Sequence, residues 1–535
     1  MLPADQMSEM IIVDALSSGI GRRVSSRDSI GCGPRTVAGV LEKNGVGCRI
    51  KMAEELLSVR SVDRKFQHLA LSAMTMDLPA AKRVISSWRK SRPGGRVLVG
   101  GPISSDPSLV MTELRPDVVV IGEGEGTLEE LLRKGFLSGE TDLSSVKGIA
   151  YRRGANPIVT GRRPLLSANQ MSDEYIPSIT RTVDYPAYQA DRVYVEVVRG
   201  CSNLRRARLR LPDGRKCSDC GNCDSDDPAA RIVCPENIPP GCGFCSVPAT
   251  WGPPRSRSPD AIVEEVRGLL DLGVHRIVLE APDFLDYMRG NGDVVDPCEP
   301  PANLDAIDGL LGSLAVLPQL ADGSVHIDIE NMKACLLNDE VCDVISRNMK
   351  EIRPNIGLET GSQQHMREIG KCGTPADVVR AVRIAKEHGM HPFVYLIYGL
   401  PGESEQTVDE SVRLMRELDK EGAQRIILYG FRPLPGSAFE QFPAPSLNAL
   451  LTRRMLREAE RINRAKKAQY VGRVIRGVAA EPSWARHGHT MVYPLADGPM
   501  MTVQGGYSPG TVLDVRITDI LSPNLVMGEA LHSSQ

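Results

Sequence analysis

The sequence has few aromatic residues and no long hydrophobic run. Phe, Trp and Tyr make up 4% of its 535 residues, so we expect hydrophobic cores built from aliphatic side chains. No run of about 18 apolar residues occurs, so we expect no transmembrane helix. The first residues, MLPADQMSEMIIVD, lack the basic segment that begins a signal peptide. We therefore expect a cytoplasmic protein in a reducing compartment.

An excess of charge of either sign is also lacking. The formal net charge is −3 and the pI is about 6.4. This balance argues against a general binder of nucleic acids or membrane surfaces. Hydrophobic residues still make up 41% of the chain, which is enough for packed cores. Its length suggests about three or four domains.

Apolar segments alternate with helical ones in the first quarter of the chain. Short, β-rich segments such as MIIVDAL, HLALSAM, RVLVGG and DVVVIGEGE are separated by stretches with helical periodicity. The alternation predicts an α/β domain over residues 1–140, with a parallel sheet covered on both faces in a Rossmann- or flavodoxin-like arrangement. Residues 141–190 are less regular and are predicted to be a linker.

Six further apolar strands, each with helical neighbours, fall within residues 191–447. Six βα units predict a partial, open TIM-type (β/α)6 barrel, whose chemistry lies at the C-terminal ends of the strands. Residues 448–469 are predicted to form a basic connecting helix. Residues 470–535 change to short strands separated by Gly and Pro, which predicts a small β-barrel.

Seven of the thirteen cysteines fall between positions 201 and 245. Cys242 and Cys245 form a CxxC pair, a spacing shared by zinc and iron–sulfur sites. In a reducing compartment such clustering favours metal over disulfides. The remaining cysteines are scattered, and we interpret them as small core or loop residues. They are Cys32, Cys48, Cys298, Cys335, Cys342 and Cys372.

The residues around and after the CxxC pair resemble the radical S-adenosylmethionine (SAM) enzymes. The similarity includes CSVPATWGPPRSRSPDAIVEE and, further on, GLETGS (357–362), GLPGES (399–404) and FRPLPGSAF (431–439), in the order found in that family. The resemblance implies a [4Fe–4S] cluster held by three thiolates, with SAM bound at the fourth iron. Reductive cleavage of SAM would then release a 5′-deoxyadenosyl radical.

The spacing of the first cysteine departs from that family. Three residues usually separate the first two cysteines, whereas segment 202–241 separates Cys201 from Cys242. In one assignment Cys201, Cys242 and Cys245 hold the cluster, and the insert binds an auxiliary iron or zinc ion. In the other, Cys234 completes the triad and Cys201 joins the insert site. We favour the first because Cys201 directly ends a strand. The insert ligands are then Cys217, Cys220, Cys223 and Cys234.

The resemblance also implies contacts with SAM. Phe244 lies within CxFC, where the family packs an aromatic ring near SAM. Glu280 ends the second barrel strand, although the GGE pattern of the family is absent there. A structural role at the rim of the barrel is the alternative for the polar residues. The other expected contacts are Glu359, Gly399 and Pro401, with Glu330 and Asn331 facing the pocket.

The N-terminal domain resembles the cobalamin-binding domain that precedes many radical SAM methyltransferases. The similarity rests on SAMTMD (72–77), VLVGGP (97–102) and VVVIGEGEGT (118–127). It implies cobalamin contacts at Ser72, Gly100, Gly101, Gly122, Glu123 and Gly124.

One cobalamin feature is missing. Leu16 stands where the DxHxxG motif has its cobalt-ligating histidine, so cobalamin is expected to bind against Leu16 without that ligand. A Rossmann-like domain without a ligand is one alternative. A methylthiotransferase domain with three cysteines is another and fits poorly, because only Cys32 and Cys48 occur here.

The last segment resembles a TRAM domain, an OB-like module. Residues 471–531 carry four Arg or Lys against five Asp or Glu. Binding to nucleic acid needs clustered positive charge and is therefore not favoured. This domain is expected to dock a protein substrate or to brace the barrel.

Together these resemblances imply a cobalamin-dependent radical SAM C-methyltransferase that acts on an unactivated sp3 carbon. The chain is similar to archaeal enzymes that methylate methyl-coenzyme M reductase. The insert and the TRAM-like end favour the glutamine C-methyltransferase type. Its partners would be the alpha chain of that reductase and an external electron donor. The alternatives are a tRNA methylthiotransferase-like enzyme, with a second cluster and no corrinoid, and a non-enzymatic zinc module.

Overall fold

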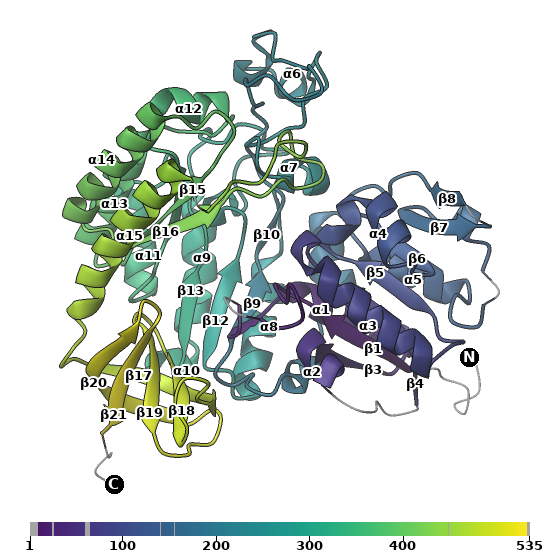
Figure 1. Cartoon of the computed structure of the whole chain (residues 1–535), viewed down its shortest axis with the longest axis horizontal. Helices are drawn as coiled ribbons and strands as arrows, with labels where there is room; N and C mark the ends of the chain where they lie inside the picture. The colour runs from purple at the N-terminus through teal and green to yellow at the C-terminus, as the bar shows by residue number, and fades with distance from the viewer. Residues whose placement is uncertain are drawn as a thin grey trace. The chain divides into compact units, whose positions relative to one another are not determined.

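A computed structural model describes residues 9–23, 26–58, 65–139, 141–154, 156–447 and 449–531. The chain forms two compact units, Met1–Tyr194 and Val195–Gln535 (Figure 1). The outer ends of the first and last predicted domains, 1–8 and 532–535, lie outside the described residues. In the described part, no helix is both long and apolar enough to cross a membrane.

The first unit is built on a seven-stranded sheet with the order β3-β1-β4-β5-β6-β7-β8. The first five of these strands are parallel. Counted along the chain, they have the order 2-1-3-4-5 of flavodoxin-like sheets. Their bounds are β1 (Glu9–Asp14), β3 (Cys48–Met52), β4 (Phe66–Ser72), β5 (Val97–Gly100) and β6 (Val118–Val120), and the short β2 (Ser29–Ile30) lies outside this sheet.

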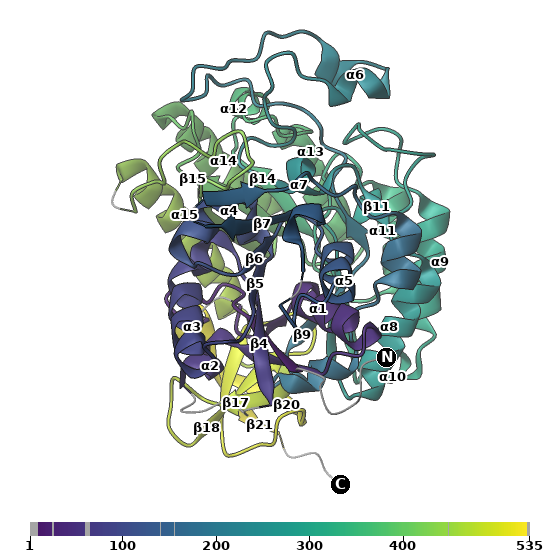
Figure 2. The same cartoon turned by 90° about the vertical axis from the view of Figure 1, so that its right-hand side faces the viewer.

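Helices cover both faces of this sheet. Figure 2 shows α2 and α3 on one side and α1 and α5 on the other. The central strands are therefore buried on both faces and are almost wholly aliphatic, as in Met10–Val13. The helices are α1 (Cys32–Lys43), α2 (Ala53–Ser58), α3 (Leu78–Ser91), α4 (Pro107–Glu113) and α5 (Glu125–Arg133).

The segment predicted to be a linker, 141–190, supplies the last two strands of the sheet. β7 (Ile149–Arg153) pairs antiparallel with β6, and β8 (Asn156–Val159) pairs antiparallel with β7. Only the first residues of β7 are buried, and β8 is largely exposed at the edge of the sheet. A hairpin with so little apolar surface gives a weak signal in the sequence.

The second unit contains the expected six parallel barrel strands. β13-β12-β9 form one group and β14-β15-β16 the other, and the bridge between Asn331 and Asn355 joins them. The partial (β/α)6 barrel is thereby confirmed. The strands are β9 (Arg192–Glu196), β12 (Arg276–Glu280), β13 (His326–Ile329), β14 (Asn355–Glu359), β15 (Phe393–Tyr398) and β16 (Arg425–Gly430), with the short pair β10 (Val198–Arg199) and β11 (Arg255–Ser256) beside them.

Helices follow the barrel strands, as Figure 1 shows for α13, α14 and α15. They begin where the sequence supplies capping residues: the Ser258 side chain, for example, accepts a hydrogen bond from the N–H of Ala261. Their bounds are α6 (Pro228–Ile232), α7 (Val247–Trp251), α8 (Pro259–Asp271), α9 (Leu304–Ala315), α10 (Pro318–Ala321), α11 (Asp339–Asn348), α12 (Gln363–Glu368), α13 (Pro375–Glu387), α14 (Glu405–Glu421) and α15 (Leu450–Ala468).

The C-terminal strands close into a five-stranded barrel with the order β17-β18-β19-β21-β20. Its strands pair antiparallel except for β19 with β21, which are parallel. This is a Greek-key arrangement, as in OB-folds, and the small barrel is confirmed. The likeness to TRAM domains stays a prediction. The strands are β17 (Val474–Pro482), β18 (His489–Pro494), β19 (Met500–Gln504), β20 (Val512–Ser522) and β21 (Leu525–Ala530).

The small barrel contacts the N-terminal ends of the large barrel's strands. The Tyr470 hydroxyl donates to Asp497 at 2.5 Å and accepts from Gln424, just before β16, at 2.6 Å. The Arg276 guanidinium, at the start of β12, lies 5.5 Å from the centre of the Tyr493 ring. Chemistry in TIM-type barrels takes place at the opposite ends of the strands. These contacts favour bracing over substrate docking.

Candidate active site

Cys201 lies just past β10, after the first barrel strand. The preceding Gly200 has φ of +92°, and a Cβ atom there would lie 2.2 Å from the carbonyl oxygen of Pro253. Only glycine fits this turn without displacing the backbone. The Cys201 N–H donates to the carbonyl of Gly252 at 3.0 Å. The first cysteine is thus tied to the segment that follows the CxxC pair.

The CxxC loop is fixed through its own backbone. The Cys245 N–H donates to the carbonyl of Cys242 at 2.8 Å, which curls the loop around the two thiols. The Gly243 N–H donates to the Ile369 carbonyl at 2.6 Å, so the loop is also held by the segment after β14.

Asn203 connects the first cysteine to the CxxC pair. Its backbone N–H donates to Cys201 Sγ at 3.5 Å, and its side-chain nitrogen donates to Cys242 Sγ at 3.2 Å. The same side-chain nitrogen donates to the Gly370 carbonyl at 3.0 Å. Sequence reasoning missed Asn203, although it stands two residues after Cys201.

The three thiols share one electrostatic environment. Burial raises the pKa of Cys201 to about 12 and also raises the pKa values of Cys242 and Cys245. The Lys371 ammonium lowers the pKa of Cys242, whereas the nearby thiols of Cys372, Cys245 and Cys201 raise it further. Without a metal these thiols are therefore protonated, and an incoming iron would displace their protons.

The sulfurs of Cys201, Cys242 and Cys245 are spaced more widely than those of a single-ion site. In a [4Fe–4S] cluster each thiolate binds a different iron, which separates the sulfurs by roughly 6 Å. Among the described residues, the sulfurs of Cys201, Cys242 and Cys245 do not all lie within 4.8 Å of one another. The three sulfurs are therefore too far apart to ligate one ion together, and the cluster is the arrangement that the sequence resemblance implies.

Cys234 has a different environment. Its sulfur accepts from the Ile238 N–H at 3.4 Å, and its side chain packs, as does Cys217, against the hydrophobic cluster that includes Phe431. Cys201, in contrast, is among the thiols that raise the pKa of Cys242. This geometry supports Cys201 as the third cluster ligand.

The insert cysteines converge loosely around Arg206. Burial lowers the pKa of this guanidinium, and the thiols of Cys223, Cys234 and Cys220 oppose that shift. Over the described part of the chain, no three insert sulfurs lie within 4.8 Å of one another. The auxiliary iron or zinc ion therefore stays a prediction.

Glu359, whose predicted contact with SAM stays a prediction, interacts with the cysteine site. It ends β14 with φ of +66°, an uncommon conformation for a residue other than glycine, and it is buried. Its carboxylate accepts a hydrogen bond from Lys371 Nζ at 2.9 Å. The same carboxylate raises the pKa of Cys245. Backbone strain of this kind is concentrated at functional sites.

The other residues predicted to contact SAM lie at strand ends or in the motif loop. Phe244 packs against the hydrophobic cluster that contains Phe439. The Pro401 carbonyl accepts from His365 at 2.8 Å, and the Gly399 N–H donates to Glu403 at 2.8 Å. Contacts of Phe244, Gly399 and Pro401 with SAM stay predictions, as do those of Glu280, Glu330 and Asn331.

A buried charged network beside Cys201 was missed by sequence reasoning. Lys333 Nζ lies 2.9 Å from Asp283 and 2.8 Å from Asp286, and donates to Ser202 Oγ at 2.7 Å. Although burial lowers the pKa of Lys333, the two carboxylates raise it well above its ordinary value. The sequence contains one hint of this network: each of its residues comes shortly after a barrel strand.

Gly243, in the middle of the CxxC pair, offers a direct test of how tightly this loop is packed. A Cβ on Gly243 would lie 2.4 Å from the ring of Phe439, which itself packs against Phe431 and Phe442. Gly243→Ala is therefore expected to destabilise the protein by about 1–3 kcal/mol and to reduce bound iron after reconstitution. Iron analysis and denaturant unfolding measure both effects.

The control is Gly309→Ala, at an exposed position of α9 where no atom lies within 4 Å of the new Cβ. It should be neutral or stabilising, because alanine favours helix. Equal iron content in the two variants would contradict the tight fit at Gly243.

In the first unit, the residues predicted to bind cobalamin lie at one edge of the sheet. Leu16 follows β1, Ser72 ends β4, Gly100 ends β5 and Gly122 follows β6. Gly122 has φ of +73°, and no atom lies within 4 Å of a Cβ built there. Ligands of flavodoxin-like sheets bind at this edge.

Two of the predicted cobalamin residues have structural tasks. A Cβ on Gly101 would lie 2.9 Å from the Ala73 carbonyl oxygen, so glycine is required there. The Glu123 carboxylate accepts a hydrogen bond from the Leu166 N–H at 2.5 Å. Gly124 precedes α5. Cobalamin contacts of Leu16, Ser72, Gly100, Gly101, Gly122, Glu123 and Gly124 stay predictions.

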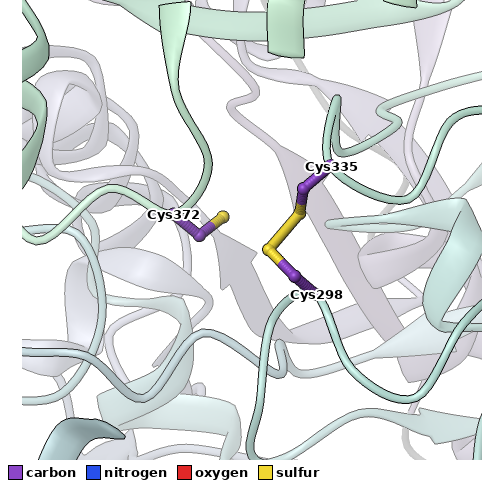
Figure 3. A group of neighbouring side chains, drawn as sticks. All are labelled: Cys298, Cys335 and Cys372. Carbon is purple, nitrogen blue, oxygen red and sulfur yellow. A yellow bond between two sulfur atoms is a disulfide. The ribbon is translucent and has the colours of Figure 1, made fainter.

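Three of the cysteines interpreted as scattered come together in the second unit. Cys298 and Cys335 form a disulfide, and the sulfur of Cys372 lies beside it (Figure 3). All three sulfurs lie within 4.8 Å of one another. The interpretation as scattered core or loop residues therefore misses the grouping of these three. The cysteines lie in segments that follow β12, β13 and β14, and such segments meet at one end of a barrel.

Two archaeal proteins match almost the whole chain. The uncharacterized protein MK0932 of Methanopyrus kandleri is 39% identical over 98% of this chain and 96% of its own. The uncharacterized protein MJ1620 of Methanocaldococcus jannaschii is 38% identical over 93% of each. The chain belongs to their family. The B12 binding domain matches residues 24–132 and the Radical SAM superfamily matches residues 233–415.

The fold of this family member is also found in a solved structure. The radical SAM methyltransferase TsrM of Kitasatospora setae, determined with cobalamin and a [4Fe–4S] cluster, has a TM-score of 0.55. The match covers 81% of this chain and 77% of TsrM at 14% identity, which shows a shared fold. The domain matches confirm a radical SAM enzyme with the expected [4Fe–4S], SAM and cobalamin cofactors.

Proposed function

We propose that this enzyme is a cobalamin-dependent radical SAM C-methyltransferase acting on an unactivated sp3 carbon. One observation carries the proposal: a single chain joins a B12-binding unit to a barrel with three thiols at its chemical end. TsrM, which shares the fold, is itself described as a methyltransferase.

The residues of the chain fit both cofactors. Cys201, Cys242 and Cys245 would hold the cluster, which with SAM would supply a hydrogen-abstracting radical, and the N-terminal unit would hold cobalamin, which would supply the methyl group. Lys371 offsets the negative charge that thiolates bring into a partly buried site. Leu16 offers an apolar surface where related domains present a histidine.

The proposed substrate is a protein side chain, the glutamine of methyl-coenzyme M reductase. The sequence resemblance described above supports it, and both close relatives come from organisms whose names mark them as methane producers. The small barrel is docked at the N-terminal strand ends, away from the thiols. It is therefore not needed to hold SAM.

A reconstitution experiment tests the function. The full chain is purified anaerobically, loaded with iron, sulfide and hydroxocobalamin, and given a strong reductant, methyl-labelled SAM and a glutamine-containing peptide of the reductase. We expect retained cobalamin, 5′-deoxyadenosine and label in the peptide. The control peptide carries asparagine in place of the glutamine.

The outcomes separate the alternatives. Failure to retain cobalamin would remove the proposed methyl carrier. Sulfur transferred together with the methyl group, without a corrinoid, would favour methylthiolation instead. Label in both peptides would keep C-methylation and reject glutamine as the specific target.

A further inference from the structure

Cys298, Cys335 and Cys372 form a second sulfur group in the barrel, which we call the three-cysteine site. Figure 3 shows the third sulfur facing the disulfide. Each of the three sulfur atoms lies within 4.8 Å of the other two. Cys372 is 7% exposed, and the other two cysteines are partly buried. Three separate segments of the chain therefore converge on one small volume.

A disulfide explains only two of these cysteines. Cys372 comes from a third segment, after α12, and its sulfur reaches the same point. A buried thiol that serves only as core packing has no reason to meet two others. Three converging sulfurs are instead the donor set of thiophilic metal ions.

The distances distinguish a single ion from a cluster. Zinc–sulfur bonds of about 2.3 Å place the sulfurs of a tetrahedral site about 3.8 Å apart. A four-iron cluster separates them by roughly 6 Å. The three sulfurs of the three-cysteine site all lie within 4.8 Å of one another, closer than a four-iron cluster places its thiolates. Once the disulfide between Cys298 and Cys335 is opened, the site therefore suits a single ion.

Two buried lysines lie near this site, and each also pairs with carboxylates: Lys333 with Asp283 and Asp286, and Lys371 with Glu359. Three thiolates around a divalent ion carry a net charge of −1, which needs compensation where solvent is excluded. Lys371 precedes Cys372 in the chain, and Lys333 stands two residues before Cys335. The thiol of Cys372 interacts electrostatically with both ammonium groups.

We propose that the reduced three-cysteine site binds one thiophilic divalent ion, Zn²⁺ or Fe²⁺, with water as the fourth ligand. A dithiol reductant first opens the disulfide: it is oxidised to its own disulfide, and Cys298 and Cys335 each become a thiol. Binding of the ion then forms three metal–sulfur bonds and releases three protons.

Metal analysis tests the proposal in the full chain. The protein is reduced with dithiothreitol without oxygen, loaded with Co²⁺ as a spectroscopic probe, and desalted. We expect Cys372→Ala to lose one bound ion and part of the thiolate-to-cobalt charge-transfer absorption. Cys48→Ser, a half-buried cysteine of the first unit, is the control and should lose neither. Cys372→Ala leaves the disulfide partners in place, so it should fold.

Cys298→Ser and Cys335→Ser give the same expected loss of one ion. If these variants instead lost four irons after cluster reconstitution, the single-ion assignment would be overturned. Unchanged metal content, together with peptides still joined through Cys298 and Cys335 after dithiothreitol, would show a disulfide only. These readouts do not depend on methyl transfer, so they hold whether or not the proposed function is correct.

Discussion

Cys201→Ala is expected to abolish cleavage of SAM, whereas Cys234→Ala should leave it largely intact. The reason is geometric: Asn203 donates to the sulfurs of both Cys201 and Cys242. Cys234 packs instead against the hydrophobic cluster of the insert. A cluster that loses one of its three thiolates is no longer held in the site, so no open iron remains to bind SAM.

The measurement is 5′-deoxyadenosine formed by anaerobically reconstituted protein with a strong reductant. We expect a fall on the order of 100-fold or more for Cys201→Ala, together with loss of most cluster absorbance. Cys48→Ser serves again as the control. The opposite result, with Cys234→Ala inactive and Cys201→Ala active, would assign the triad to Cys234, Cys242 and Cys245.

Asp286→Ala is expected to cost about 3–5 kcal/mol of unfolding free energy, because it leaves the buried Arg289 without its carboxylate partner and Lys333 with one carboxylate in place of two. Asp286 lies 2.8 Å from Lys333 and 2.8 Å from Arg289, and the side chains of Asp286 and Arg289 are fully buried. Its carboxylate also accepts from the Ser202 N–H at 3.2 Å. Since Ser202 follows Cys201, the variant should also bind less iron.

The free energies of unfolding of Asp286→Ala and of the control variant Asp308→Ala are compared by denaturant unfolding. Asp308 pairs with Arg347 at 3.1 Å, but their side chains are 46% and 59% exposed. An exposed pair of this kind contributes little to stability, because solvent screens it. If the two variants lost equal stability, the network beside Cys201 would not be held by buried charge. If Asp286→Ala kept its full iron content, the network would not position Cys201.

The number of residues between two cysteines says little about whether they meet. The cost of closing a loop rises slowly with its length, so a 40-residue insert between Cys201 and Cys242 is tolerated. The spacing therefore left Cys201 and Cys234 both open. The contacts of Asn203, which connects two segments far apart in the chain, favour Cys201.

Sequence spacing also could not predict the three-cysteine site. Cys298 and Cys335 are 37 residues apart, and no motif connects them in the sequence. Each follows a different barrel strand, and only closure of the barrel brings those strand ends together. The docking of the small barrel through Gln424 and Arg276 is likewise a contact between elements distant in the sequence.

The sequence by itself determined the two α/β patterns, the six barrel strands and the small C-terminal barrel. Apolar periodicity and turn residues are local properties, and each segment carries its own. The tertiary structure decided which cysteines meet, which charges are buried beside them and which end of the barrel the last domain braces. These properties depend on distances between segments remote in the chain, which no local pattern specifies.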